Sequence, residues 1–127
     1  MASELRVTTI ANNAGTESVD TSYVINGSAK MWVDVRGVST ASINKSLNTS
    51  GLTDNGTGDY TVSFTNNFDG GNYSVVAEVA FTTTGDAQNT RITTIAAGSV
   101  RALGTNTGNA IAADCRRLFK TAHGDLA

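Results

Sequence analysis

The stretch Ser50–Phe81, SGLTDNGTGDYTVSFTNNFDGGNYSVVAEVAF, decides the fold of this chain. It contains two runs of alternating apolar and polar residues, Tyr60–Phe64 and Tyr73–Phe81, and a cluster of Asn, Asp and Gly precedes each run. Successive side chains of a β-strand point to opposite faces, so each run presents one apolar face. The pattern predicts a β-hairpin at the centre of the core. The residues expected on its apolar faces are Tyr60, Val62, Phe64, Tyr73, Val75, Ala77, Val79 and Phe81.

Composition extends this prediction to the whole chain. A length of 127 residues is typical of one domain. Charged residues make up only 16%, against about 25% in an average domain. With 13 Gly and no Pro, the chain favours short strands joined by Gly and Asn turns, and helix is disfavoured throughout. We therefore predict one all-β domain over residues 1–127, an antiparallel β-sandwich of about seven or eight short strands, with residues 1–16 forming an N-terminal arm or an edge strand.

Further strands are expected where apolar and β-branched residues recur. In the segment Ala29–Val35, Met31, Val33 and Val35 form one apolar face while Trp32 lies between charges on the other. The segment Ala41–Leu47 is expected to place Ala41, Ile43, Lys45 and Leu47 on one face. The last segment, Ala110–Thr121, fits a strand or a short helix, and we favour the strand because a sandwich needs a closing strand. The remaining expected strands are Leu5–Ile10, Tyr23–Ile25, Thr90–Ala97 and Val100–Leu103.

Part of the chain resembles a module of bacteriophage fibre and tail-fibre-like proteins. The resemblance rests on LTDNGTGDYTV at Leu52–Val62, on AKMWV at Ala29–Val33 and on NYSVV at Asn72–Val76, with a similar lead-in at Glu4–Thr16. It extends to about residue 81, and beyond that point only the strand pattern agrees. Fibre proteins commonly form trimers, so the resemblance implies a homotrimer that covers its exposed strand edges. Aromatic residues are enriched in interface cores, and we place Trp32, Tyr23 and Phe119 at this interface.

Charge and apolar patterning exclude several classes of protein. The net charge is −2, the isoelectric point is near 5.1, and the basic residues are scattered except for Arg116 and Arg117. Nucleic-acid binding needs a concentrated basic surface, so no nucleic-acid partner is expected. No apolar run approaches the ~18 residues of a membrane span, and the N-terminus lacks the pattern of a secretory signal. We expect synthesis in a host cytoplasm, no membrane insertion and a final location in the virion.

Residues suited to catalysis are few, and we expect no enzyme activity and no cofactor. The single histidine, His123, is expected in a mobile tail, and the single cysteine, Cys115, is expected to be a buried structural thiol. One Cys and one His do not complete a zinc site. Asp54, Asn55 and Asp59 offer oxygen ligands for Ca²⁺, but a turn in which such side chains cap their own backbone is the favoured interpretation.

The first functional hypothesis is a non-enzymatic virion protein, a short tail fibre or spike subunit that contacts host surface polysaccharide. Its expected partners are further copies of itself and other virion proteins. The alternative is a capsid decoration protein, a head fibre or cement subunit that stabilises the phage head. A free carbohydrate-binding module is the third hypothesis, and it is the weakest because Trp32 alone has an obviously exposed place in the alternation.

Overall fold

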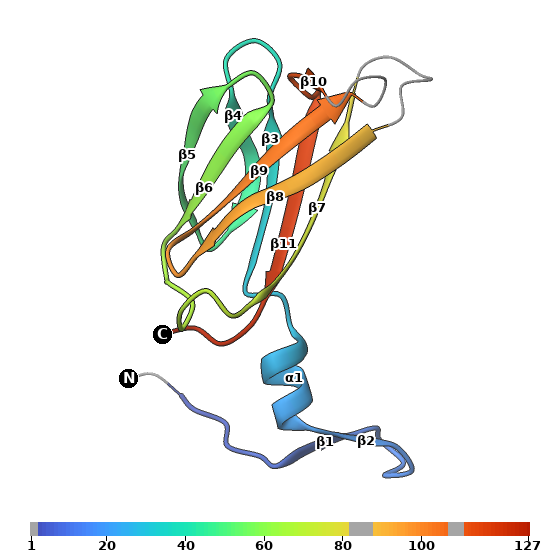
Figure 1. Ribbon diagram of the computed structural model, residues 1–127. Helices are drawn as coiled ribbons and strands as arrows, with labels where there is room; N and C mark the ends of the chain where they lie inside the picture. The colour runs from blue at the N-terminus through green and yellow to red at the C-terminus, as the bar shows by residue number, and fades with distance from the viewer. Residues whose placement is uncertain (1–2, 82–87, 107–110) are drawn as a thin grey trace.

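Two antiparallel sheets pack face to face in a computed structural model that describes residues 3–81, 88–106 and 111–127 (Figure 1). The four-stranded sheet has the order β4-β3-β11-β7, and its strands are β3 (Met31–Arg36), β4 (Ser42–Leu47), β7 (Ser74–Ala80) and β11 (Arg117–His123). The five-stranded sheet has the order β10-β9-β6-β5, with β8 also paired to β9. Its strands are β5 (Thr49–Gly56), β6 (Asp59–Phe64), β8 (Gln88–Ala96), β9 (Ser99–Asn106) and β10 (Ile111–Ala112).

The predicted all-β sandwich is confirmed, with more strands than the seven or eight expected. The two runs that decided the prediction do supply the core. Their inward side chains Tyr60, Val62, Phe64, Tyr73 and Val79 are buried, and Val75 and Phe81 pack against them. Every residue of the core cluster lies between Met31 and Ala122.

The predicted pairing of these two runs is wrong. Strand β6 pairs with β5 and β9, whereas β7 pairs with β11, so the two runs belong to opposite sheets. The chain crosses between the sheets through a corner filled by Phe68, which is buried. Its ring stacks on Tyr73 at a centroid distance of 4.1 Å and meets Phe64 edge-on at 5.2 Å. Burying these three rings together favours the crossing over a tight hairpin.

The hairpin partner of β6 is β5, which the sequence analysis interpreted as part of a turn region. The turn between them uses Gly56 and Gly58, whose φ angles of 127° and 69° favour glycine. A second difference concerns β4. A register shift opposite Asp34 and Val35 places Ile43 opposite Val35 but Lys45 opposite Asp34. Ile43 therefore packs against the core while Lys45 and Leu47 are exposed, so the expected single face of this strand is wrong.

Residues 3–28 lie outside the sandwich, a longer segment than the expected arm of 1–16. They form β1 (Thr9–Ala11), β2 (Ser18–Asp20) and helix α1 (Thr21–Gly27), which extend beyond one end of the sheets (Figure 1). The strand predicted at Tyr23–Ile25 is thus a helix. The Asp20 carboxylate begins it by accepting a hydrogen bond of 2.8 Å from the Ser22 N–H.

The C-terminal segment contains the closing strand that was favoured over a helix. Strand β10 and strand β11 lie on either side of residues 113–116. His123 belongs to β11, so its expected place in a mobile tail is wrong. Its Nδ1 lies 3.0 Å from the carbonyl oxygen of Gly27, at the end of α1. This contact joins the end of the sandwich to the N-terminal segment.

Candidate functional site

The loop that offered oxygen ligands uses them within the protein. The Asp54 carboxylate accepts a hydrogen bond of 3.0 Å from the Gly56 N–H, and Asn55 Nδ2 donates to Thr61 Oγ1 at 2.9 Å. The Asp59 carboxylate pairs with the guanidinium of Arg101, which is the main reason that its pKa lies below the ordinary value. The two carboxylates therefore have separate partners, and Asn55 uses its amide nitrogen. Over the described residues no group of three or more His, Cys, Asp or Glu side chains could hold a metal ion.

A polar network connects the same turn to the interior. The Tyr60 hydroxyl lies 2.9 Å from the Gly37 carbonyl oxygen and 3.0 Å from Asp114 Oδ1, and it shares its proton between these acceptors. Asp114 Oδ1 also accepts a bond of 2.8 Å from the Gly58 N–H. Burial, followed by the nearby carboxylate, raises the pKa of the phenol. A neutral, fully buried tyrosine in such a network fixes the turn and the chain before β11.

Cys115 and Lys120 are two further buried groups with nucleophilic chemistry. Burial raises the pKa of the Cys115 thiol to about 11, so the thiol stays protonated at neutral pH. Lys120, which the sequence analysis did not single out, is 1% exposed on the inward face of β11. Its Nζ crosses to the other sheet and donates to the carbonyl oxygens of Tyr60 and Val100, at 2.9 and 3.2 Å.

The environment of Lys120 perturbs its titration strongly. Desolvation lowers its pKa to about 7, although the Asp59 carboxylate opposes this shift. The alternation of the strand could have indicated this burial, because Leu118 and Ala122, two residues away on either side, share the inward face of Lys120. The buried side chain connects the two sheets through these two hydrogen bonds.

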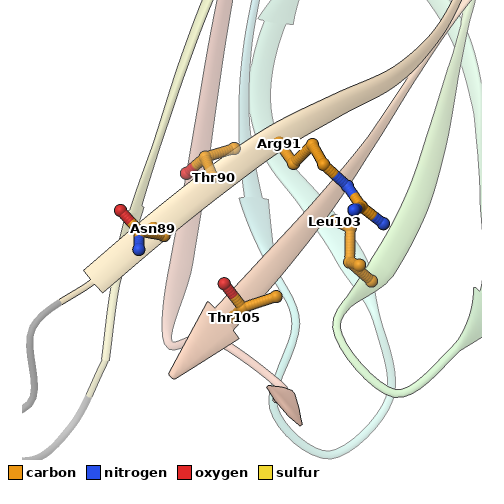
Figure 2. Close-up of a pocket in the computed structure, with 5 residues that line it drawn as sticks. All are labelled: Asn89, Thr90, Arg91, Leu103 and Thr105. Carbon is orange, nitrogen blue, oxygen red and sulfur yellow. The ribbon is translucent and has the colours of Figure 1, made fainter. Parts of the chain in front are cut away.

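A hollow on the five-stranded sheet is lined by residues of β8 and β9 alone. Figure 2 shows Arg91 extending along this surface towards Leu103, with Asn89 and Thr105 nearer the ends of the two strands. The register pairs Arg91 with Leu103 and Asn89 with Thr105. A single cation among neutral side chains offers no paired acid and base. The hollow lies on two neighbouring strands of one sheet.

The outer face of the four-stranded sheet brings two of the three predicted interface residues together. Trp32 on β3 lies opposite Thr121, and Phe119 on β11 lies opposite Asp34, so the two aromatic residues are diagonal neighbours. They are 39% and 42% exposed. Leu47 lies beside Trp32 on β4, and Val76 lies opposite Thr121 on β7. We call Leu47, Trp32, Phe119 and Val76 the apolar band.

Charged side chains surround the apolar band. Arg117 and Asp34 form an ion pair on the same outer face. Lys45 pairs across the strands with Asp34, and Glu78 lies opposite Phe119. An apolar centre with a charged rim is the arrangement found in protein interfaces.

The third predicted interface residue, Tyr23, lies apart from the apolar band on helix α1, where it is 74% exposed. It belongs to residues 3–28, which we call the N-terminal unit. None of its residues is buried. A groove between its extended start and α1 is lined by Leu5, Val7, Ile10, Val24 and Ile25 together with Glu4, Arg6 and Thr21. The structure thus separates the predicted interface residues into two surfaces.

Comparisons of the chain with protein-family models, with curated proteins and with solved structures found no match. The helix in the part of the chain described here is too short to cross a membrane.

Proposed function

We propose that this chain is a non-enzymatic structural subunit of a bacteriophage virion, a short tail fibre or spike that assembles as a homotrimer. The observation that carries the proposal is the N-terminal unit. Its two-stranded hairpin and its seven-residue helix bury none of their side chains. Isolated hairpins and helices of this size are marginal in water. A subunit of a larger assembly obtains the missing packing from its neighbours.

The location of the core within the sandwich supports the same proposal. All core residues lie between Met31 and Ala122, so the sandwich has its own core without the N-terminal unit. The unit is therefore an addition to a domain that is already packed. An addition of this kind suits attachment to other subunits.

The sequence resemblance supports a virion in particular. Its longest string, Leu52–Val62, lies on the β5–β6 hairpin, and the Ala29–Val33 string leads into β3. Both strings lie in or beside strands that pack the core. The resemblance to tail-fibre-like proteins favours the tail, where a subunit also contacts host surface polysaccharide. Capsid decoration is the alternative, because the same surfaces would serve a subunit clamped between capsid proteins.

Location in the particle tests the proposal. Purified phage particles would be labelled with a gold-tagged antibody against this chain and viewed by electron microscopy. Gold at the tail tip or along fibres is the expected result, and gold over the head would establish the decoration alternative. Particles that carry no gold, although denatured particle protein reacts with a control antibody against a known capsid subunit, would overturn the proposal of a virion protein.

A further inference from the structure

The exposed apolar side chains of this protein are confined to a few places. Of the large hydrophobic residues that are exposed in the described chain, all but Ile95 and Leu126 belong to the N-terminal unit or to the apolar band. Extended apolar patches of this kind mark interaction surfaces. The outer face of the other sheet is polar by comparison, with Thr61, Ser63 and Arg101 in its central strands. The N-terminal unit and the apolar band are thus two exposed apolar surfaces of each chain.

The N-terminal unit does not cover the apolar band of its own chain. Helix α1 leads directly into β3 and extends beyond the end of the sandwich, away from both sheet faces (Figure 1). Two side chains hold the helix in this direction. His123 Nδ1 meets the Gly27 carbonyl oxygen, and Lys30 Nζ donates to the Ile25 carbonyl and to Ser28 Oγ. The unit is positioned to reach a neighbouring molecule.

The charges of the two surfaces are complementary. The N-terminal unit carries the carboxylates of Glu4, Glu17 and Asp20 against the single guanidinium of Arg6. The rim of the apolar band carries three cations against two carboxylates, namely Arg36, Lys45 and Arg117 against Asp34 and Glu78. Opposite net charges favour the association of one surface with the other over the association of either with itself.

We propose that the N-terminal unit of one chain packs on the apolar band of a second copy of the same chain. This inference rests on the proposed function and specifies its self-assembly. Residues 3–28 match the roughly 20–30 residues that each side of a standard interface contributes. Each chain has one unit and one band, so the contact joins two different surfaces, and in the proposed homotrimer three such contacts close a ring. The groove lined by Leu5, Val24 and Ile25 receives apolar side chains of the neighbour.

Paired variants of the full chain test this contact. The double substitution Tyr23→Ala with Ile25→Ala removes apolar surface from the unit, and Trp32→Ala removes it from the band. Val76→Ser, at a site 67% exposed on an edge strand, is a second band variant whose fold is less at risk. Ile95→Ala, at a site 41% exposed on β8, is the control outside both surfaces. Sedimentation equilibrium measures self-association, and far-ultraviolet circular dichroism confirms the fold of each variant.

The expected result is that unit and band variants each weaken self-association by about tenfold or more, as removal of interface hot spots does, while the control does not. A unit variant keeps its band and a band variant keeps its unit, so mixing the two should restore association as an open pair. Full self-association of folded band variants would overturn the proposal in favour of contacts between units. Full self-association of unit variants would overturn it in favour of contacts between bands. Either outcome leaves the virion proposal standing, since gold labelling tests that separately.

Discussion

Replacing the buried Lys120 by methionine should stabilise the protein. The residue is 1% exposed, and in the described chain its ammonium donates to two backbone carbonyl oxygens. The pKa of this lysine falls from 10.5 to about 7 because burial removes the charge from water. At pH 7 this pKa difference means that burying the charged side chain lowers the free energy of unfolding by roughly 4 kcal/mol. Methionine would leave two carbonyls without this donor, and each unpaired buried group costs about 1–3 kcal/mol, so the expected net gain is at most roughly 2 kcal/mol.

The pH dependence of this effect has a definite sign. Below pH 7 the amine is protonated in both the folded and the unfolded chain, and the cost of burying its charge is fully present. As the pH rises above 7 the folded protein loses the proton first, so the cost falls, by roughly 2 kcal/mol up to pH 8.5. Above this range the stability no longer reports on Lys120 alone. The pKa of the Cys115 thiol is raised from 9.0 to about 11 by folding, so the thiol ionises first in the unfolded chain and stabilises it.

Urea unfolding of both proteins, followed by circular dichroism at pH 7 and pH 8.5 and at one chain concentration, measures this prediction. The unfolding free energy of the wild type should rise towards that of Lys120→Met as the pH increases. A difference between the two proteins that stays constant over this range would refute the reasoning, because it would show that the folded lysine keeps an ordinary pKa. A methionine variant less stable than wild type at pH 7 would show that the two hydrogen bonds outweigh the buried charge.

Three further predictions concern the turn end of the sandwich and the buried thiol. Tyr60→Phe should lower the unfolding free energy by about 1–3 kcal/mol, because it removes the hydroxyl that donates to the buried Gly37 carbonyl oxygen and to Asp114, and an unchanged urea midpoint would contradict this. Gly58→Ala should cost at least about 2 kcal/mol, since φ is 69° and a Cβ would lie 2.5 Å from the Ala113 carbonyl oxygen. The control Gly51→Ala, with open space around its Cβ, should be close to neutral, and equal losses would refute the steric argument. The Cys115 thiol should react with a disulfide reagent about a hundredfold or more slowly than in urea, since its pKa rises from 9.0 to about 11, and equal rates would show an accessible thiolate.

Alternation of side chains identified the core correctly but not the pairing of the strands. The runs around Val62 and Val79 each have one buried face, as period two requires. Whether consecutive strands pair or cross to the opposite sheet depends on the packing of the connection. Here Phe68, in an otherwise polar loop, fills the corner between the sheets. The alternation of residues within the strands does not reveal the effect of one apolar residue in a loop.

Local polar contacts account for the other differences. The Asp20 cap begins a helix in a segment whose Tyr, Val and Ile content favours a strand. A register shift opposite Asp34 separates Ile43 from Lys45, which strict alternation places together. At the candidate site, Trp32 was recognised as half-exposed because charges flank it, and the structure agrees. Its closeness to Phe119 depends on the register of β3 and β11, which sequence alone does not define.

The molar mass of the full chain in solution tests the central claim of assembly most directly. Light scattering coupled to gel filtration at micromolar concentration should give three times the 13.1 kDa of one chain. A trimer is the result that the account predicts, and the unit and band variants then identify the surfaces that form it. A monomer with intact β-sheet circular dichroism would contradict both the homotrimeric subunit and the contact between unit and band.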